Sequence, residues 1–118
     1  MKKFILTAIF ASIVSVSFAK DEFNYYGKTT DYKKIGWMDI GMEAIKDKIN
    51  DPESAIFRDV YFNQGRDGIP ITCGEINAKN LLGGYIGFQQ FISAGKAELT
   101  FLQEEVSDFP ILWNRLCH

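Results

Sequence analysis

The stretch Ile56–Ala78, IFRDVYFNQGRDGIPITCGEINA, decides the fold that we expect for this chain. Its first part, Ile56–Asn63, is rich in aromatic and β-branched residues, which is typical of a β-strand. Residues 65–68 (GRDG) are a turn signal, and the strand-like pattern returns over Ile69–Ala78. Two such runs around a short turn predict an antiparallel hairpin.

The hairpin is expected to continue into a meander of three or four antiparallel strands. Residues 80–84 (NLLGG) form a second break, and Tyr85–Ile92 (YIGFQQFI) is the predicted third strand. After a turn at residues 93–96, Ala97–Leu102 (AELTFL) is the predicted fourth strand.

A helix is expected before the meander, where apolar residues recur at spacings of four, three and four. These residues are Met38, Met42, Ile45 and Ile49. A methionine stripe can mark a binding surface, but this spacing favours a place in the core. Pro52 should end the helix, and Asp51 should cap a fresh turn. Residues 20–34 show no sustained period and are expected to form an extended or loosely ordered lead-in.

A second helix is expected at the end of the chain. Ser107 or Asp108 can cap it, and Pro110 suits its first turn. Its apolar stripe consists of Leu112, Trp113, Leu116 and Cys117. The predicted class is therefore α+β, with a helix, an antiparallel meander and a C-terminal helix packed on the sheet.

The first 19 residues read as a secretory signal peptide. A basic head, Met1–Lys3, precedes an uncharged apolar run over Phe4–Val16, and Ser17-Phe18-Ala19 supplies small residues at the cleavage site. The apolar run is shorter than the roughly 20 residues of a transmembrane helix, although an uncleaved anchor is the alternative. Cleavage would leave residues 20–118 as a single small domain in the periplasm or outside the cell, without a transmembrane anchor.

The composition of the mature chain excludes several classes of function. Loss of Lys2 and Lys3 leaves 11 basic residues against 15 acidic ones, a net charge of −4. Because Lys33-Lys34 is then the only basic pair, nucleic-acid binding has no support. Residues 83–87 (GGYIG) lack the lysine and hydroxyl pair of a phosphate loop. We expect no cofactor.

The two cysteines, Cys73 and Cys117, are expected to form a disulfide, because their number is even and the predicted compartment is oxidising. The alternatives are unpaired thiols, a nucleophilic Cys73 or a metal site. His118, the only histidine, is the last residue, and adjacent residues such as Cys117 and His118 lack the usual ligand spacing. We therefore expect no metal.

The segment after Cys73 contains the residues that we expect to contact a partner. In a strand, Glu75 and Asn77 share the face of Cys73 and point toward the terminal helix. Glu75 is expected to pair with Lys79, Arg58 or Arg115. Tyrosine and amide side chains, which suit protein interfaces, make up most of the candidate interaction residues. These residues are Glu75, Asn77, Lys79, Asn80, Tyr85 and Gln89.

These segments carry a resemblance to a known family. The pattern DPESA-x-FR at residues 51–58, CGE-x-NAKN at 73–80 and GGY-x-GF at 83–88 resembles a family of small secreted bacterial and prophage proteins of uncharacterised function. The resemblance runs from Trp37 to the end of the chain, and it agrees with a disulfide between the glycine-rich segment and the terminus. This chain departs from the pattern at Leu81-Leu82, where a polar turn would be expected.

Two classes of function follow from the sequence. The first is an exported non-enzymatic binding or accessory protein of the bacterial envelope, such as an inhibitor, an immunity-type protein or an assembly factor, whose partner is another envelope or secreted protein. The alternative is a small periplasmic hydrolase, which would need two carboxyl groups across a cleft. Glu75 with Asp59 or Glu98 is the best pair that the sequence offers.

Overall fold

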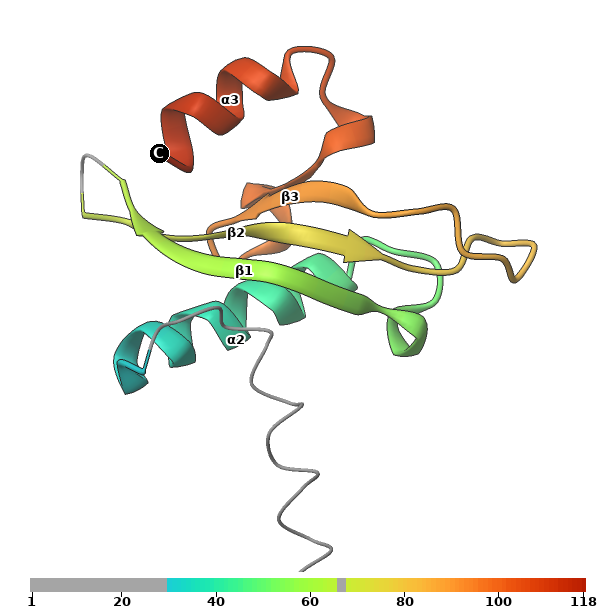
Figure 1. Cartoon of the computed structure of the whole chain (residues 1–118), viewed down its shortest axis with the longest axis horizontal. Helices are drawn as coiled ribbons and strands as arrows, with labels where there is room; N and C mark the ends of the chain where they lie inside the picture. The colour runs from blue at the N-terminus through green and yellow to red at the C-terminus, as the bar shows by residue number, and fades with distance from the viewer. Residues whose placement is uncertain (1–29, 66–67) are drawn as a thin grey trace, which may run out of the picture.

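A four-stranded antiparallel sheet separates two helices in this structure, a computed structural model that describes residues 30–65 and 68–118. Helix α2 (Tyr32–Lys46) covers one face of the sheet, and helix α3 (Phe109–Leu116) lies over part of the other (Figure 1). The predicted α+β class is confirmed, and so is the place of the two helices before and after the meander.

The strands follow one another in space as they do in sequence, in the order β1-β2-β3-β4. Their bounds are Ile56–Gln64 for β1, Pro70–Asn77 for β2, Gln89–Ser93 for β3 and Thr100–Leu102 for β4. The predicted hairpin is confirmed, because β1 and β2 pair antiparallel from Ile56 opposite Asn77 to Gln64 opposite Pro70.

The last two strands are shorter than the sequence predicts. Residues 85–88 belong to a loop rather than to β3, because Gly87 adopts a φ of 108°, which ends the extended backbone. Ala97–Leu99 forms a 3₁₀ turn, closed by the Leu99 N–H on the carbonyl of Lys96, so that β4 begins only at Thr100.

A β-bulge in β1 was not predicted from the sequence. The register shifts between Arg58 and Tyr61, and Asp59 has a φ of 53°. The extra residue puts Phe57 and Val60 on the same face although they are three positions apart. Both side chains therefore reach the core beneath α2.

Helix α2 begins earlier than predicted. Asp31 caps it, because its carboxylate accepts the N–H groups of Lys33 at 2.9 Å and Lys34 at 3.3 Å. The expected lead-in is thus wrong over residues 32–34, which are helical. The fresh turn predicted after Asp51 is confirmed as the 3₁₀ turn Pro52–Ser54, with Asp51 in the N-cap position. The Asp51 side chain makes no capping bond, however, and its carbonyl accepts the N–H of Ser54.

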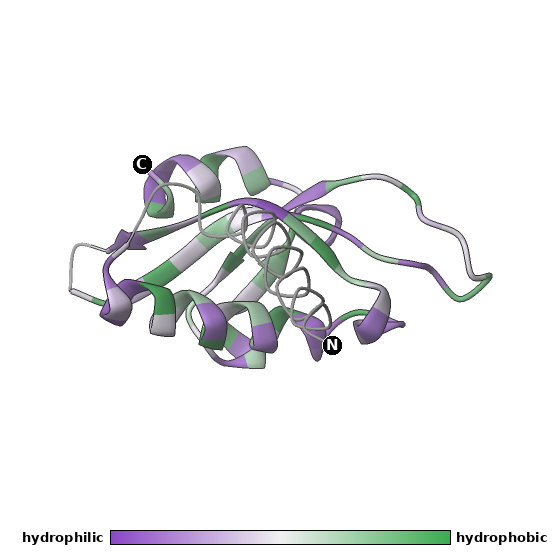
Figure 2. Ribbon diagram, turned by 60° about the horizontal axis from the view of Figure 1, so that its bottom comes forward, coloured by the Kyte–Doolittle hydropathy of each residue, from purple (hydrophilic) through white to green (hydrophobic). Residues whose placement is uncertain are grey.

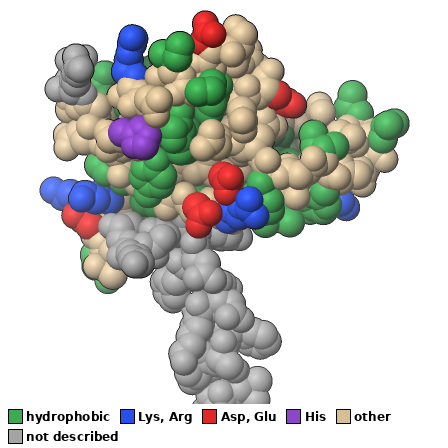
Figure 3. Space-filling view, turned by 45° about the horizontal axis from the view of Figure 1, so that its top comes forward, with side chains coloured by type: hydrophobic (Ala, Val, Ile, Leu, Met, Phe, Trp, Pro, Cys, Tyr) green, Lys and Arg blue, Asp and Glu red, His purple; other side chains and the backbone are tan. Residues whose placement is uncertain are grey.

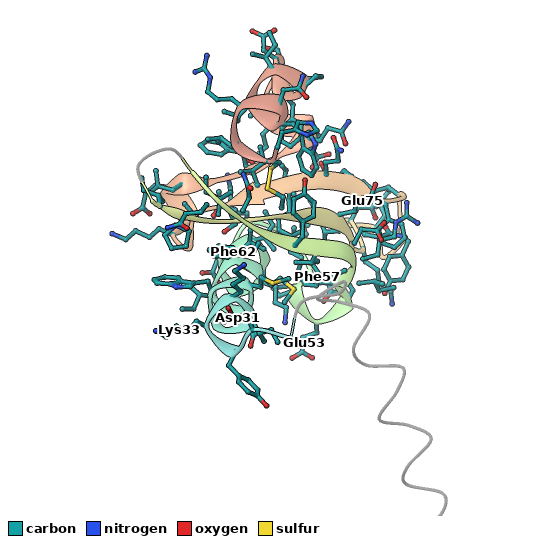
Figure 4. The ribbon with its side chains drawn as sticks, turned by 60° about the vertical axis from the view of Figure 1, so that its left-hand side comes forward. Asp31, Lys33, Glu53, Phe57, Phe62 and Glu75 are labelled. Carbon is teal, nitrogen blue, oxygen red and sulfur yellow. A yellow bond between two sulfur atoms is a disulfide. The ribbon has the colours of Figure 1, made fainter. Side chains whose placement is uncertain are left out.

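The first core lies between α2 and the sheet, and it confirms that the methionine stripe is buried. Figure 4 shows Phe57 and Phe62 on the α2 side of the sheet and Glu75 on the opposite side. Gly41 lets the helix approach β2 closely, because a Cβ there would lie 2.6 Å from the Cβ of Thr72. The buried members are Met38, Met42, Ile45, Phe57, Val60, Ile76, Phe91 and Leu102.

The second core lies under α3 and contains the predicted disulfide, Cys73–Cys117, with its Cα atoms 6.0 Å apart. Ile71, Ile92 and Phe109 are buried around it. The Tyr61 hydroxyl donates to the carbonyl of Cys117 at 2.8 Å, and burial raises the pKa of Tyr61 above its ordinary value. The disulfide excludes the alternatives of free thiols and a nucleophilic Cys73.

The start of α3 matches the prediction in part. Pro110 lies in its first turn, and Asp108 precedes the helix, but the Asp108 side chain makes no capping bond. Its carbonyl accepts the N–H groups of Ile111 and Leu112 instead.

Across residues 30–65 and 68–118, none of the helices has the length and apolar character needed to cross a bilayer. The predicted signal peptide, residues 1–19, and the lead-in up to residue 29 lie outside the described part of the chain.

Candidate functional site

The connection between β2 and β3, residues 78–88, projects from the sheet and is called the β2–β3 loop here (Figure 1). A tight turn forms its tip. The N–H of Asn80 donates to the carbonyl of Gly84 at 2.9 Å, and the N–H of Gly83 donates back to the carbonyl of Asn80 at 3.0 Å. Gly83 has a φ of 84°, a conformation that glycine adopts without strain.

The Asn80 side chain completes the turn from inside. Its Oδ1 accepts the N–H of Leu82 at 3.0 Å and that of Gly84 at 3.2 Å. Asparagine is favoured in such turns because its short side chain can bond to backbone groups a few residues ahead. Four N–H groups of the turn, those of Asn80, Leu82, Gly83 and Gly84, are therefore bonded within the turn itself.

The base of the loop is fixed to the 3₁₀ turn that follows α2. The Ser54 hydroxyl accepts the N–H of Lys79 at 2.8 Å and donates to the carbonyl of Asp51 at 2.7 Å. The Tyr85 hydroxyl donates to the carbonyl of Ser54 at 2.8 Å. Lys79 and Tyr85 also form an isolated β-bridge. Ser54 thus holds both legs of the loop.

Two further side chains hold the return leg. Asn77 Oδ1 accepts the N–H of Gly87 at 3.1 Å. Gln89 Oε1 accepts the N–H of Glu104 at 3.1 Å, which ties the start of β3 to the turn after β4. These bonds compensate for the missing ladder over residues 85–88.

The tip exposes two adjacent leucines, Leu81 at 85% and Leu82 at 94% of their surface. Figure 2 shows the hydrophobic tip at the far end of the loop, and Figure 3 shows hydrophobic side chains protruding from the same end of the molecule. Ile86 on the return leg is also exposed. Single exposed leucines are common on protein surfaces, whereas an apolar cluster on a fixed projection is typical of a contact site.

Beside the loop, part of the sheet face is left uncovered by α3 and carries a charged and aromatic stack. Arg58 Nε lies 2.6 Å from Glu75 Oε1, across the register pair that joins β1 and β2. The Arg58 guanidinium carbon lies 3.8 Å from the centre of the Phe88 ring. Of the three partners predicted for Glu75, the structure selects Arg58. Because the pair is partly exposed, it orients side chains more than it stabilises the fold.

All six predicted interaction residues lie in or beside the loop, and each makes a contact within the chain. Glu75 pairs with Arg58, and the ammonium of Lys79 lies 5.6 Å from the centre of the Tyr85 ring. The amide side chains of Asn77, Asn80 and Gln89 accept backbone N–H groups. These residues shape the loop and hold it in place.

The residues that sequence reasoning missed are the two leucines that these contacts display. A signal was present, since leucine is uncommon in tight turns and the pair departs from the family pattern. The exposure of the two leucines could not be predicted from the sequence, because an apolar pair in a loop can equally fold back onto the core.

The hydrolase alternative needs Glu75 and a second carboxylate across a cleft. Glu75 faces the guanidinium of Arg58, and its register partner on β3 is Gln90. Asp59 lies in the bulge of β1, and Glu98 lies in the 3₁₀ turn that follows β3. The contact that the structure shows for the Glu75 carboxylate is thus with a cation.

The described surface includes a small cleft and a larger open groove. A cleft of about 70 Å³, lined by Ile76, Asn80 and Gln89 among others, lies under the loop and has room for a few water molecules. An open groove of about 390 Å³ runs between α2 and the turn after β3. Neither is lined by Glu75. Among residues 30–65 and 68–118, no three or more His, Cys, Asp or Glu side chains are grouped so that they could hold a metal ion.

Comparison with protein-family models, with curated proteins and with solved structures finds no match. The resemblance to the secreted bacterial and prophage family therefore stays a hypothesis that rests on the quoted residues alone.

Proposed function

We propose that this chain is an exported, non-enzymatic binding or accessory protein of the bacterial envelope, of the inhibitor, immunity-type or assembly-factor kind. It acts through the β2–β3 loop and the adjoining stack of Arg58, Glu75 and Phe88. The observation that carries the proposal is the exposed leucine pair on a turn that backbone bonds and the Asn80 side chain hold together.

The construction of the loop favours binding over a purely structural role. Leu81 and Leu82 are almost wholly in water, so they contribute almost no burial to the fold. The hydrogen bonds that the Ser54 and Asn80 side chains accept from the loop backbone nevertheless hold the two leucines on a fixed projection. A loop that is ordered before binding loses less conformational entropy on association, which raises the affinity.

The disulfide is compatible with the predicted export. Cys73 and Cys117 are paired and buried, and such bonds persist in the periplasm and outside the cell. The partner that we propose is accordingly another envelope or secreted protein.

Capture from envelope extract tests the proposal, with the exported chain immobilised at several salt concentrations. Gly84→Arg is the blocking variant, because a Cβ at Gly84 meets no atom within 4 Å and the added side chain would cover the loop. Gly36→Arg is the matched control on α2, where a Cβ is equally unopposed.

We expect saturable capture that Gly84→Arg weakens and Gly36→Arg leaves intact. The proposal fails if no saturable partner is recovered at any salt concentration. It also fails if the two variants retain the partner equally well.

A further inference from the structure

We propose that Leu81 and Leu82 insert together, as one plug, into an apolar pocket of a folded partner protein. This inference rests on the proposed function and specifies the chemistry of the partner's site. The two side chains are adjacent on one turn, and at 85% and 94% exposure nearly all of their surface is available for contact.

The turn presents the leucines in a fixed arrangement. Asn80 accepts two N–H groups of the turn through its side chain and bonds to Gly83 and Gly84 through its backbone. The legs are fixed independently at Ser54. Leu82 takes part in these bonds only through its backbone N–H, and no leucine side chain is involved, so replacing the leucine side chains should leave the turn folded.

The loop that carries the plug has few charges in its own sequence. Lys79 is the only charged residue between Ile76 and Gly95, and its ammonium already lies beside the Tyr85 ring. Contact at the tip must therefore depend on shape and apolar burial, and it should respond little to salt. Exposed Ile86 extends the same apolar surface down the return leg.

A protein pocket fits these features better than a lipid bilayer does. Even a myristoyl chain gives only marginal membrane binding, and two leucine side chains contain far fewer carbons. Surface binding would need a basic cluster to supplement them, whereas the chain has acidic residues in excess and a single lysine in the loop. A closed apolar pocket would gain from both side chains without such help.

The expected effect follows from the surface that the two leucines would bury. Full burial of a leucine corresponds to a gain in affinity of about 10- to 100-fold. Truncating both to alanine should therefore weaken binding by about 100-fold or more, whereas methionine, which has a similar volume, should keep most of the affinity.

The protein that the mature chain captures from envelope extract is first purified. The test then measures the affinity of the mature chain for that purified protein. The variants are Leu81→Ala/Leu82→Ala and Leu81→Met/Leu82→Met. Ile111→Ala on α3 is the matched control, since Ile111 is also exposed and apolar but lies outside the loop. A parallel arm measures co-sedimentation with vesicles of phosphatidylethanolamine and phosphatidylglycerol. Far-UV circular dichroism checks that each variant is folded.

We expect the double alanine variant to lose about 100-fold in affinity, and the methionine and Ile111 variants to change by less than about fivefold. Raising the salt from about 50 to about 300 mM should change the affinity by less than about threefold. The inference is overturned, and the proposed function survives, if the double alanine variant binds the partner as tightly as the parent chain. Vesicle binding that depends on the leucines would also overturn the inference, because a lipid surface rather than a protein pocket would then be the binding site of the two leucines. Absence of any saturable partner would overturn both proposals.

Discussion

The disulfide between Cys73 and Cys117 should supply a large share of the stability of this domain. It links residues 44 positions apart, and closing a loop of that size lowers the entropy of the unfolded chain by the equivalent of about 4 kcal/mol. A domain of this size has a total free energy of unfolding of about 5–15 kcal/mol. With a urea m-value of about 1–2 kcal/mol/M, reduction should lower the midpoint of unfolding by about 2–4 M.

Equilibrium urea unfolding of the domain, followed by circular dichroism with and without a reductant, measures this shift. Reduction keeps both sulfur atoms in the second core, so the comparison isolates the cross-link. The variant Cys73→Ala/Cys117→Ala removes the sulfurs as well and should be less stable than the reduced chain, because both side chains are buried. Midpoints that differ by less than about 0.5 M between the oxidised and reduced chains would refute the reasoning.

Substitutions at three further residues test the bulge, the base of the loop and a charged contact. Asp59→Val should lower the free energy of unfolding by about 1–2 kcal/mol in thermal denaturation and Asp59→Gly should not, because Asp59 has a positive φ. Ser54→Ala removes the acceptor of the Lys79 N–H, so hydrogen exchange at that amide should accelerate about tenfold; an unchanged rate would contradict the role given to Ser54. Burial alone would raise the pKa of the Glu105 carboxyl. The hydrogen bonds from Lys48 and from the Leu102 N–H, together with the charge of Lys48, outweigh burial, so the pKa lies below the ordinary glutamate value. The ionised carboxylate therefore stabilises the fold at pH values above the ordinary glutamate pKa, and this stabilisation is lost as the pH falls through the lowered pKa of the folded state. Glu105→Gln should accordingly lower the free energy of unfolding in urea at neutral pH, and this difference from the parent chain should shrink in acid.

The arrangement of the chain into helices and strands was predictable from the sequence because it depends on local periodicity. Met38, Met42 and Ile45 repeat at helical spacing, and all three are buried against the sheet. The β-branched and aromatic run of β1 and the turn signal after it likewise predicted the hairpin. The disulfide was predictable from an even cysteine count together with the predicted export signal.

The boundaries and irregularities were not predictable in the same way. The bulge at Asp59 exists because Phe57 and Val60 must both reach the core under α2, a demand that only the packed helix creates. The third strand begins at Gln89, four residues after the predicted start at Tyr85, because Gly87 and the bonds to Asn77 and Ser54 give the preceding residues another course.

For the candidate site, the sequence alone determined which residue types are concentrated between Cys73 and Gln89, since composition is a local property. Only the tertiary structure decided their roles, turning Asn77, Asn80 and Gln89 inward to hold the backbone and leaving Leu81 and Leu82 in water. The physical reason is that the exposure of a side chain depends on what the rest of the chain packs against it. Here Ser54, 27 positions before Leu81, fixes the base from which the leucines project.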